Sequence, residues 1–124
     1  MRARLPAAAL AVLVAAALAL AALAGARAPA RTTVTIKGPN GDFSGKVLSP
    51  RKSCLGNRTV VVHRLRGNGY DPANDPRIGS DTSERNGNRG VWSLGNTGIK
   101  HGTFYARVKR SPGCRGAFSL PIKF

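Results

Sequence analysis

The sequence has few acidic residues, and its apolar residues do not follow a helical repeat. Only five of the 124 residues are Asp or Glu, against 20 Lys or Arg, so the formal net charge at pH 7 is +15. A charge balance of this kind favours solubility and attraction to polyanions without specifying a fold. Beyond the N-terminal leader, no stretch places apolar residues at helical spacing over three turns, so an α-helical domain is not expected.

The sequence also lacks the motifs of several catalytic and metal-binding classes. It contains no G-x-S-x-G nucleophile elbow, so a serine hydrolase of that type is not indicated. The two histidines, His63 and His101, do not have the spacing of a known ligand pattern, so a two-histidine metal site is the less favoured interpretation. We therefore expect a protein that is not an enzyme, with no catalytic residue, no cofactor and no metal ion.

The first residues have the layout of a secretory signal peptide. Arg2 and Arg4 form a positive start, residues 5–23 are almost entirely Ala, Leu and Val, and small residues follow. Because the apolar stretch approaches the roughly 18 residues that can span a bilayer, an uncleaved membrane anchor is the alternative. Three A-x-A triplets offer cleavage after Ala26, Ala28 or Ala30, and cleavage after Ala26 is preferred.

This leader divides the chain into three parts. Residues 1–26 are the signal peptide, predicted to be helical, residues 27–31 are a short linker, and residues 32–124 are one domain. The leader contributes only Arg2 and Arg4 to the net charge of +15, so the mature part carries +13. We expect a secreted or extracellular protein whose membrane contact is limited to the signal segment.

The two cysteines, Cys54 and Cys114, lie far apart in the sequence and beside basic residues. They do not form the C-x-x-C pattern of a redox motif, and they are too few for a structural zinc site. Neighbouring cations would activate a free thiol, so a cysteine nucleophile is the alternative. In an exported chain we expect a structural disulfide, which for a loop of this length stabilises the fold by roughly 4 kcal/mol.

Alternating segments of the mature chain predict an all-β domain. Stretches rich in Val, Thr and aromatic residues are separated by clusters of Gly, Asn, Pro and Ser. Because each sheet must cover its apolar face, we expect two packed sheets. Pro121 has no N–H for the ladder and places the last strand at an edge. The expected strands cover residues 32–37, 43–49, 59–66, 77–80, 90–94, 102–110 and 117–123.

Period-two alternation within these strands predicts which side chains face the core. One face of each strand is apolar and the other is cationic. Trp92 is expected in the core. In the strand over 102–110 the expected core residues are Phe104, Ala106 and Val108. In the strand over 117–123 they are Phe118, Leu120 and Ile122.

Four motifs follow one another between residues 43 and 108. They are FSGKVLS, RTVVVHR, GSDTSERNGNRGVWSL and HGTFYARV. Their order and spacing resemble the prealbumin-like or transthyretin-like β-sandwich, especially the carboxypeptidase regulatory-like domains. The matching positions are Gly45, Val47, Val60 to Val62, Asp81, Thr82, Gly90, Trp92, Leu94, Gly102, Phe104, Ala106 and Val108.

The resemblance implies a seven-stranded Greek-key β-sandwich that acts in adhesion, in carbohydrate or protein binding, or as a spacer on secreted enzymes. The last strand has no asparagine for the isopeptide bond of related adhesin modules. The channel histidines of hormone-carrying or hydrolytic members have no clear match either.

A cationic outer face is the expected binding surface. A tyrosine among cations can stack on a sugar or a base. Such a face suits an anionic cell-envelope polymer or an acidic protein. No recognition helix or RNA-binding aromatic motif occurs, so no specific nucleic acid is expected. The predicted residues of this face are Lys46, Arg64, Tyr105, Arg107 and Lys109.

The polar loop over 67–88 offers the main alternatives. Its oxygen-bearing residues Asp71, Asn74, Asp75 and Asp81 are weak calcium candidates, since the regular ligand alternation of a calcium loop is missing. The simpler interpretation is a solvated loop whose carboxylates pair with arginines. We expect a secreted, non-catalytic β-sandwich that serves as a binding or structural module. A small secreted enzyme inhibitor or enzyme that uses this loop is the alternative.

Overall fold

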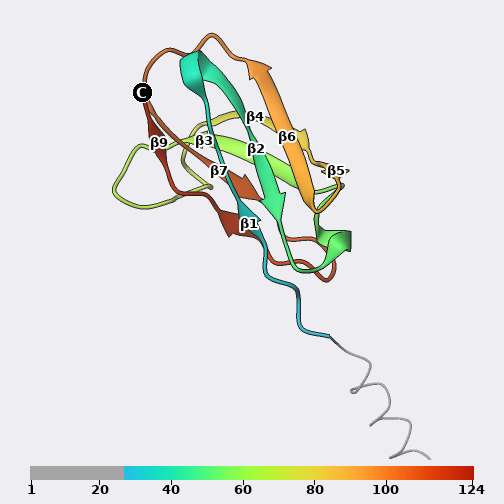
Figure 1. Ribbon diagram of the computed structural model, residues 1–124. Coiled ribbons are helices and arrows are strands. Elements are labelled where there is room, and N and C mark those ends of the chain that lie inside the picture. Colours follow the sequence, from blue (N-terminus) through green and yellow to red (C-terminus); the bar gives the residue numbers. More distant parts are fainter. Residues whose placement is uncertain (1–26) are drawn as a thin grey trace, which may run out of the picture.

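The computed structural model describes residues 27–124 as two antiparallel sheets packed against each other (Figure 1). The all-β prediction is confirmed. The four-stranded sheet has the order β1-β2-β6-β5 and consists of β1 (Thr33–Val34), β2 (Asp42–Leu48), β6 (Arg89–Asn96) and β5 (Glu84–Asn86). The five-stranded sheet has the order β4-β3-β7-β8, with β9 also beside β7, and consists of β4 (Arg77–Thr82), β3 (Thr59–Arg64), β7 (Thr103–Val108), β8 (Ala117–Phe118) and β9 (Ile122–Lys123).

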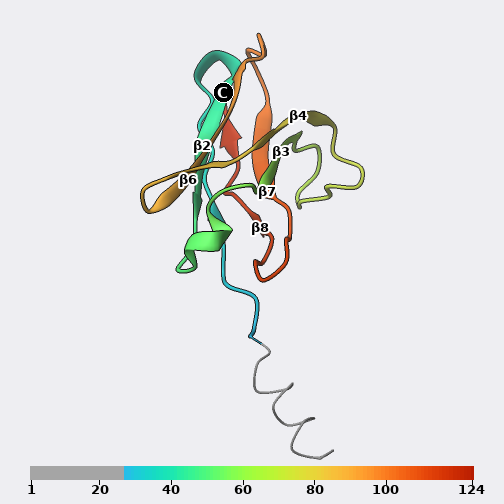
Figure 2. The same cartoon turned by 90° about the vertical axis from the view of Figure 1, so that its right-hand side faces the viewer.

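Two short 3-10 turns, Pro39–Gly41 and Lys52–Cys54, complete the elements of the described part. Viewed edge-on in Figure 2, the strands β2 and β6 lie in one layer and β3 and β7 in the other. Among residues 27–124, no helix is long and apolar enough to cross a bilayer. The predicted signal helix and the possible membrane anchor fall on residues 1–26, outside the described residues.

The described part contains nine strands where seven were expected. The additional β5 forms because Gly87, with φ +64°, lets the chain turn back after Asn86 and pair with Arg89. A glycine in this conformation is the usual requirement of a tight hairpin turn. From the sequence, this segment was predicted to be part of a polar connection.

The expected last strand is divided into β8 and β9 by a bulge at Pro121. Ser119 donates its N–H to the carbonyl of Ala106, yet Ile122 lies opposite Phe104, so the bulged strand has one residue more than its partner. This extra residue reverses the alternation upstream of Pro121. Ser119 is therefore buried, while Phe118 and Leu120 are exposed by 45% and 84%. The prediction that these two residues belong to the core is wrong.

The core lies between the sheets and is built from aromatic and β-branched side chains. Trp92 and Phe104 are both buried, as predicted, and the ring centroids of Phe43 and Phe104 are 4.9 Å apart. The other buried members are Val34, Val47, Val60, Val62, Ala106 and Val108. Burial of these apolar side chains is the main driving force for the fold.

The two sheets meet along both of their sides. On one side, the Asp81 carboxylate at the end of β4 accepts the Ser93 N–H of β6 at 2.8 Å. On the other side, Ala30 forms a parallel bridge with Cys114, just before β8. The residues expected to be a free linker therefore take part in the fold, since Ala30 also donates its N–H to Gly113 at 2.9 Å.

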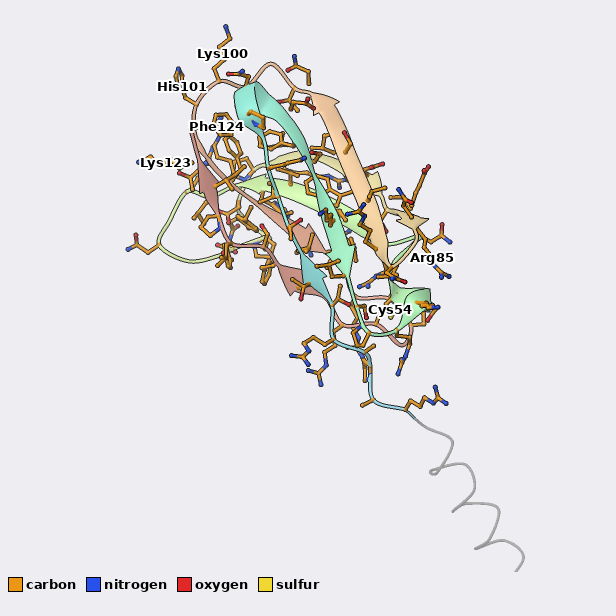
Figure 3. The ribbon with its side chains drawn as sticks, viewed as in Figure 1. Cys54, Arg85, Lys100, His101, Lys123 and Phe124 are labelled. Carbon is orange, nitrogen blue, oxygen red and sulfur yellow. A yellow bond between two sulfur atoms is a disulfide. The ribbon has the colours of Figure 1, made fainter. Side chains whose placement is uncertain are left out.

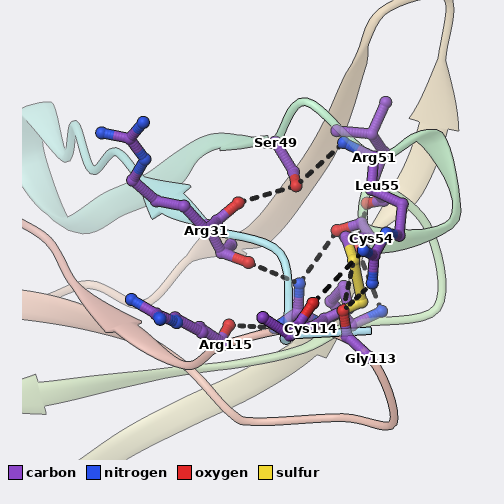
Figure 4. The surroundings of a disulfide bond; sticks show 12 residues. Arg31, Ser49, Arg51, Cys54, Leu55, Gly113, Cys114 and Arg115 are labelled. Atoms are coloured by element: carbon purple, nitrogen blue, oxygen red, sulfur yellow. Dashed lines mark hydrogen bonds between the residues drawn. A yellow bond between two sulfur atoms is a disulfide. The ribbon is translucent and has the colours of Figure 1, made fainter. Parts of the chain in front are cut away.

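The predicted disulfide between Cys54 and Cys114 is confirmed, with a Cα–Cα distance of 5.6 Å. Figure 4 shows it surrounded by hydrogen bonds, among them one of 2.6 Å from Arg51 Nη1 to the carbonyl of Gly113. It joins the turn before β3 to the turn before β8. Both cysteines are buried, so neither is available as a nucleophile.

A buried arginine supports the same region from the other side. The Arg58 guanidinium is 1% exposed and donates to the carbonyls of Cys54, Lys109 and Arg115 at 2.8 to 2.9 Å. It also donates to Thr32 Oγ1 at 3.1 Å. Burial lowers the pKa of Arg58. Four oxygen acceptors thus replace the water molecules that the buried guanidinium loses. Arg58 therefore connects the segments around the disulfide at this end of the sandwich.

Candidate functional site

Tyr105, the predicted stacking residue, is fully buried. It points outward from β7, as the alternation predicts, but the chain over 65–76 folds back over this outer face. The ring of Tyr70 lies 4.6 Å from that of Tyr105, and the His63 ring stacks against Tyr105 at 5.2 Å. The prediction of an exposed Tyr105 is therefore wrong, because a loop covers the outer face at this point.

The carboxylate of Asp75 holds this covering loop in place. It accepts hydrogen bonds from the Tyr105 hydroxyl at 2.6 Å, from the Asp71 N–H at 2.9 Å and from the Arg66 N–H at 3.4 Å. These bonds, first of all that of Tyr105, lower the pKa of Asp75. Burial and the same carboxylate raise the pKa of Tyr105 well above its ordinary value. The Asp75 carboxylate is therefore ionised, and it accepts a hydrogen bond from the neutral phenol of Tyr105.

His63 is the third polar group under the loop. Its Nδ1 lies 3.2 Å from the carbonyl of Asp75, which can only accept, so the imidazole donates through Nδ1. Its Nε2 is buried without a partner among the described residues. Burial lowers the pKa of His63, and only part of this effect is offset by the bond to Asp75. A neutral, structural histidine is the result.

The other residues of the predicted cationic face do not form one surface. Lys46 lies on the outer face of β2 in the four-stranded sheet, whereas Arg107 lies on the outer face of β7 in the five-stranded sheet. Arg64 has the inward parity of β3, and its guanidinium lies 5.0 Å from the ring centroid of Phe104. Lys109 follows β7 and is exposed. The predicted face is thus divided between opposite sides of the sandwich.

Lys46 belongs instead to a groove of about 660 Å³ on the four-stranded sheet, which we call the cationic groove. The register places Lys46 opposite Val91 and Lys37 opposite Ser44, and Arg89 directly precedes Gly90, which lies opposite Val47. Lys37 and Arg89 therefore flank Lys46 at diagonal positions of one face. Its lining residues are Thr35, Ile36, Lys37, Ser44, Gly45, Lys46, Leu48, Arg89, Val91 and Trp92.

The cationic groove combines charge with an apolar floor. Among the described residues that line it, three are cations and none carries a carboxylate. Leu48 and Val91 supply apolar surface between the cations. Glu84 pairs with Val91 from β5 and borders the cationic surface on that side. Sequence reasoning found Lys46 but missed Lys37 and Arg89, which only the strand register brings beside it.

The calcium candidates have other roles in the structure. Asp71 accepts from the Asn74 side chain at 2.9 Å, Asp75 serves the covering loop, and Asp81 joins the sheets through Ser93. Within residues 27–124, no cluster of three or more His, Cys, Asp or Glu is placed to hold a metal ion. These carboxylates accept hydrogen bonds from backbone N–H groups, from the Asn74 amide and from the Tyr105 phenol. The simpler interpretation from the sequence had paired them with arginines.

The long loop of the alternative prediction is also divided. Strands β4 and β5 occupy residues 77–82 and 84–86, so the irregular part is confined to residues 65–76. His101 is exposed in the turn before β7, at the end of the molecule opposite Cys54 in Figure 3, whereas His63 is buried. Comparisons with protein-family models, curated proteins and solved structures found no match to the chain.

Proposed function

We propose that the protein is an exported binding module that holds an anionic polymer of the cell envelope in the cationic groove and performs no catalysis. The observation that carries this proposal is the arrangement of Lys37, Lys46 and Arg89 around one open groove without a carboxylate in its lining. Clustered cations raise the local concentration of an anionic ligand, and the net charge of +13 on residues 27–124 extends that attraction.

The shape of the groove favours a polymer over a compact ligand. It is open to solvent and crosses the segment that follows β1, then β2 and β6, so a chain could lie across the strands and place its anionic groups against successive cations. The apolar side chains of Leu48 and Val91 lie where the uncharged backbone of such a chain would pass. Hydroxyl groups of Thr35 and Ser44 add hydrogen-bonding capacity.

Export is part of the proposal. The N-terminal 26 residues have the layout of a signal peptide, and structural disulfides persist in oxidising compartments. The finer fold assignment is also proposed. Seven strands remain if β8 and β9 are counted as one bulged strand and the short β5 is counted as an addition to β6, with which it pairs. That is the number implied by the resemblance to prealbumin-like Greek-key domains.

Binding of two defined polyanions, dextran sulfate and polyglutamate, tests the groove. The double variant Lys46→Glu/Arg89→Glu should weaken binding by at least about tenfold relative to the control Lys52→Glu/Lys100→Glu, which changes the net charge equally outside the groove. The variant Arg107→Glu/Lys109→Glu, on the other sheet, should behave as the control does. Equal losses in all three would show that only net charge matters and would overturn the groove.

Catalysis is tested in the same experiment. Each polymer is incubated with the protein and its size distribution is measured by gel filtration. An unchanged distribution agrees with a module that only binds, whereas progressive shortening would overturn the non-catalytic part of the proposal.

A further inference from the structure

A second surface lies on the other side of the edge strand β1, where β1 runs beside β8, and Thr35 and Ile36 line both this surface and the cationic groove. Three large side chains are exposed there: Tyr70 by 37%, Phe118 by 45% and Leu120 by 84%. We call these three residues the aromatic ledge. They border a groove of about 470 Å³ whose other lining includes Ile36, Pro121 and Ile122. We propose that this groove docks an extended segment of an acidic partner protein.

The exposure of the aromatic ledge follows from the backbone. The bulge at Pro121 turns Phe118 and Leu120 outward and places Ser119 in the interior. A regular strand with the same sequence would have buried both apolar side chains. An extra residue that exposes two large apolar groups at an edge re-aims side chains toward solvent, as bulges do near functional sites.

The two rings of the aromatic ledge, Tyr70 and Phe118, are held by contacts within the protein. The Tyr70 hydroxyl donates to the carbonyl of Ser119 at 2.7 Å, and its ring stacks on Phe118 at 5.1 Å. Tyr70 also rests on Tyr105, which Asp75 holds from below. Because these contacts fix the rings in the free protein, little conformational entropy is lost when a partner binds.

Charge complementarity identifies the partner as acidic. Arg107 lies directly opposite Phe118 in the sheet, and Lys123 lies opposite Thr103 on the same outer face, so cations flank the aromatic ledge on both sides. Among the described residues that line the groove, none is charged, so the attraction for an acidic segment comes from these flanking cations. A second copy of this chain would bring another +13 charge to the same place, which opposes self-association.

The backbone on both sides of the groove favours an extended protein segment. Lys37 and Ser44 exchange two hydrogen bonds, at 2.8 and 2.9 Å, so alternation directs the N–H and C=O of Ile36 away from β2. Likewise, Ser119 bonds to Ala106, so the backbone groups of Phe118 are directed away from β7. An edge with outward backbone groups and apolar pockets can accept an added strand, whose alternate side chains would fill the groove.

A fluorescein-labelled nonapeptide tests the site. It alternates glutamate with valine, has a central phenylalanine, and its binding is followed by fluorescence anisotropy at physiological salt. Saturable binding is expected, and Leu120→Asp should weaken it by at least about tenfold. The matched control is Ser53→Asp, which places the same charge at an exposed residue outside both grooves and should leave peptide binding unchanged.

Changes to the peptide separate the contribution of backbone pairing from that of charge. N-methylation of alternate amides should abolish binding if a strand is added, and replacement of glutamate by lysine should abolish it if charge matters. No saturable binding, equal losses in Leu120→Asp and Ser53→Asp, or unaltered binding of the methylated peptide would each overturn the proposal. A concentration-dependent dimer that Leu120→Asp removes would assign the surface to a second copy.

Separate variants distinguish a failure of this proposal from a failure of the polymer-binding proposal. Lys46→Glu/Arg89→Glu alters the cationic groove and should leave peptide binding within the range of the Lys52→Glu/Lys100→Glu control. Leu120→Asp should leave polymer binding within the range of Leu120→Ser, which removes the same apolar group without adding charge. Because Leu120 is 84% exposed, both variants are expected to fold, which circular dichroism and a count of free thiols would verify.

Discussion

The hydroxyl of Tyr105 donates a 2.6 Å hydrogen bond to the carboxylate of Asp75, which lies 30 positions earlier in the chain. This bond joins β7 to the loop over 65–76 and explains why the outer face of the five-stranded sheet is covered. It also supports Tyr70, and through Tyr70 the aromatic ledge. One phenol and one carboxylate therefore contribute to the stability of the loop, beside the bonds of His63 to Asp75 and of Tyr70 to Ser119.

Removal of the phenol should loosen the loop without disturbing the core. Tyr105→Phe keeps the ring packing and deletes only the hydrogen bond to a charged acceptor, so we expect a loss of about 1.5 kcal/mol in the free energy of unfolding. Chemical denaturation followed by circular dichroism measures this. The control Tyr70→Phe deletes a bond to a neutral carbonyl and should lose less. Equal losses would contradict the special role of Asp75.

The protein should lose stability in acid in two separate pH ranges. His63 has a pKa below its ordinary 6.5 in the fold because it is buried, so the unfolded chain takes up its proton first and stability falls as pH drops below about 6.5. Asp75 has a pKa below its ordinary 3.8, mainly because of Tyr105, so its contribution is lost only at more acidic pH. Melting temperatures measured from pH 8 to pH 3 record both ranges.

A histidine exchange assigns the upper range. His63→Asn keeps a side-chain donor toward the Asp75 carbonyl and cannot titrate, so the decline between pH 6.5 and the Asp75 range should become smaller. His101→Asn removes the exposed histidine and should leave the profile unchanged. If both variants alter the profile equally, the buried histidine is not its origin.

The disulfide should contribute a large part of the stability. Replacing both partners, Cys54→Ala/Cys114→Ala, opens a loop with a sequence separation of 60 residues. The chain-entropy model gives a loss of roughly 4 kcal/mol. Urea denaturation at low temperature, where the variant stays folded, measures the difference, and a loss below about 1 kcal/mol would contradict that model here.

Arg58 should be coupled to the disulfide. Arg58→Lys cannot supply the planar fork that reaches acceptors on two sides, so we expect a loss of at least about 2 kcal/mol. Arg51→Lys, which changes a less buried arginine of the same region, should lose less. Because Arg58 contacts Cys54 and Arg115 directly, its loss and that of the disulfide should not add in a double-mutant cycle. Additive losses would argue against the coupling.

Gly45 should tolerate no side chain. A Cβ at this position would collide with the Thr35 carbonyl and approach Trp92 Nε1 to 2.8 Å, where the indole donates to Thr35. Gly45→Ala should therefore destabilise the fold strongly and change the fluorescence of the single tryptophan. At Gly69 a Cβ would meet nothing within 4 Å, so Gly69→Ala should have little effect on either measurement.

Much of the fold was predictable because it depends on local patterns. Alternation located β2, β3, β4, β6 and β7 within a few residues, and it identified Trp92 and Phe104 as core residues. The leader and the cysteine spacing predicted the disulfide. In each case the evidence lies in neighbouring residues or in the chemistry of one residue type.

The errors have one physical origin, which is contact between distant segments. The burial of Tyr105 depends on a loop that reaches back from Asp75, and nothing near Tyr105 in the sequence indicates it. The exposure of Leu120 depends on where the bulge falls relative to β7. Pro121 was identified as irregular, but a proline alone does not specify on which side the extra residue will be accommodated.

The prediction of a single cationic binding face was wrong for the same reason. Charges on alternate positions were assigned to one surface, although the strands that carry them belong to different sheets. Lys37 and Arg89 become neighbours of Lys46 only through the register of β1, β2 and β6. A pairing argument for those strands could have found them, because Lys37 and Arg89 share the outward parity of Lys46.

The pairing of Ala30 with Cys114 bears on the proposed removal of an N-terminal signal peptide. A chain processed after Ala26 keeps the bonds that Ala28 and Ala30 make to Arg51, Gly113 and Arg115. Processing after Ala30 would leave the edge of the disulfide turn without its partner strand. Among the cleavage sites of the proposed signal peptide, the one after Ala26 therefore keeps all of these contacts, and N-terminal sequencing of the purified protein tests that site.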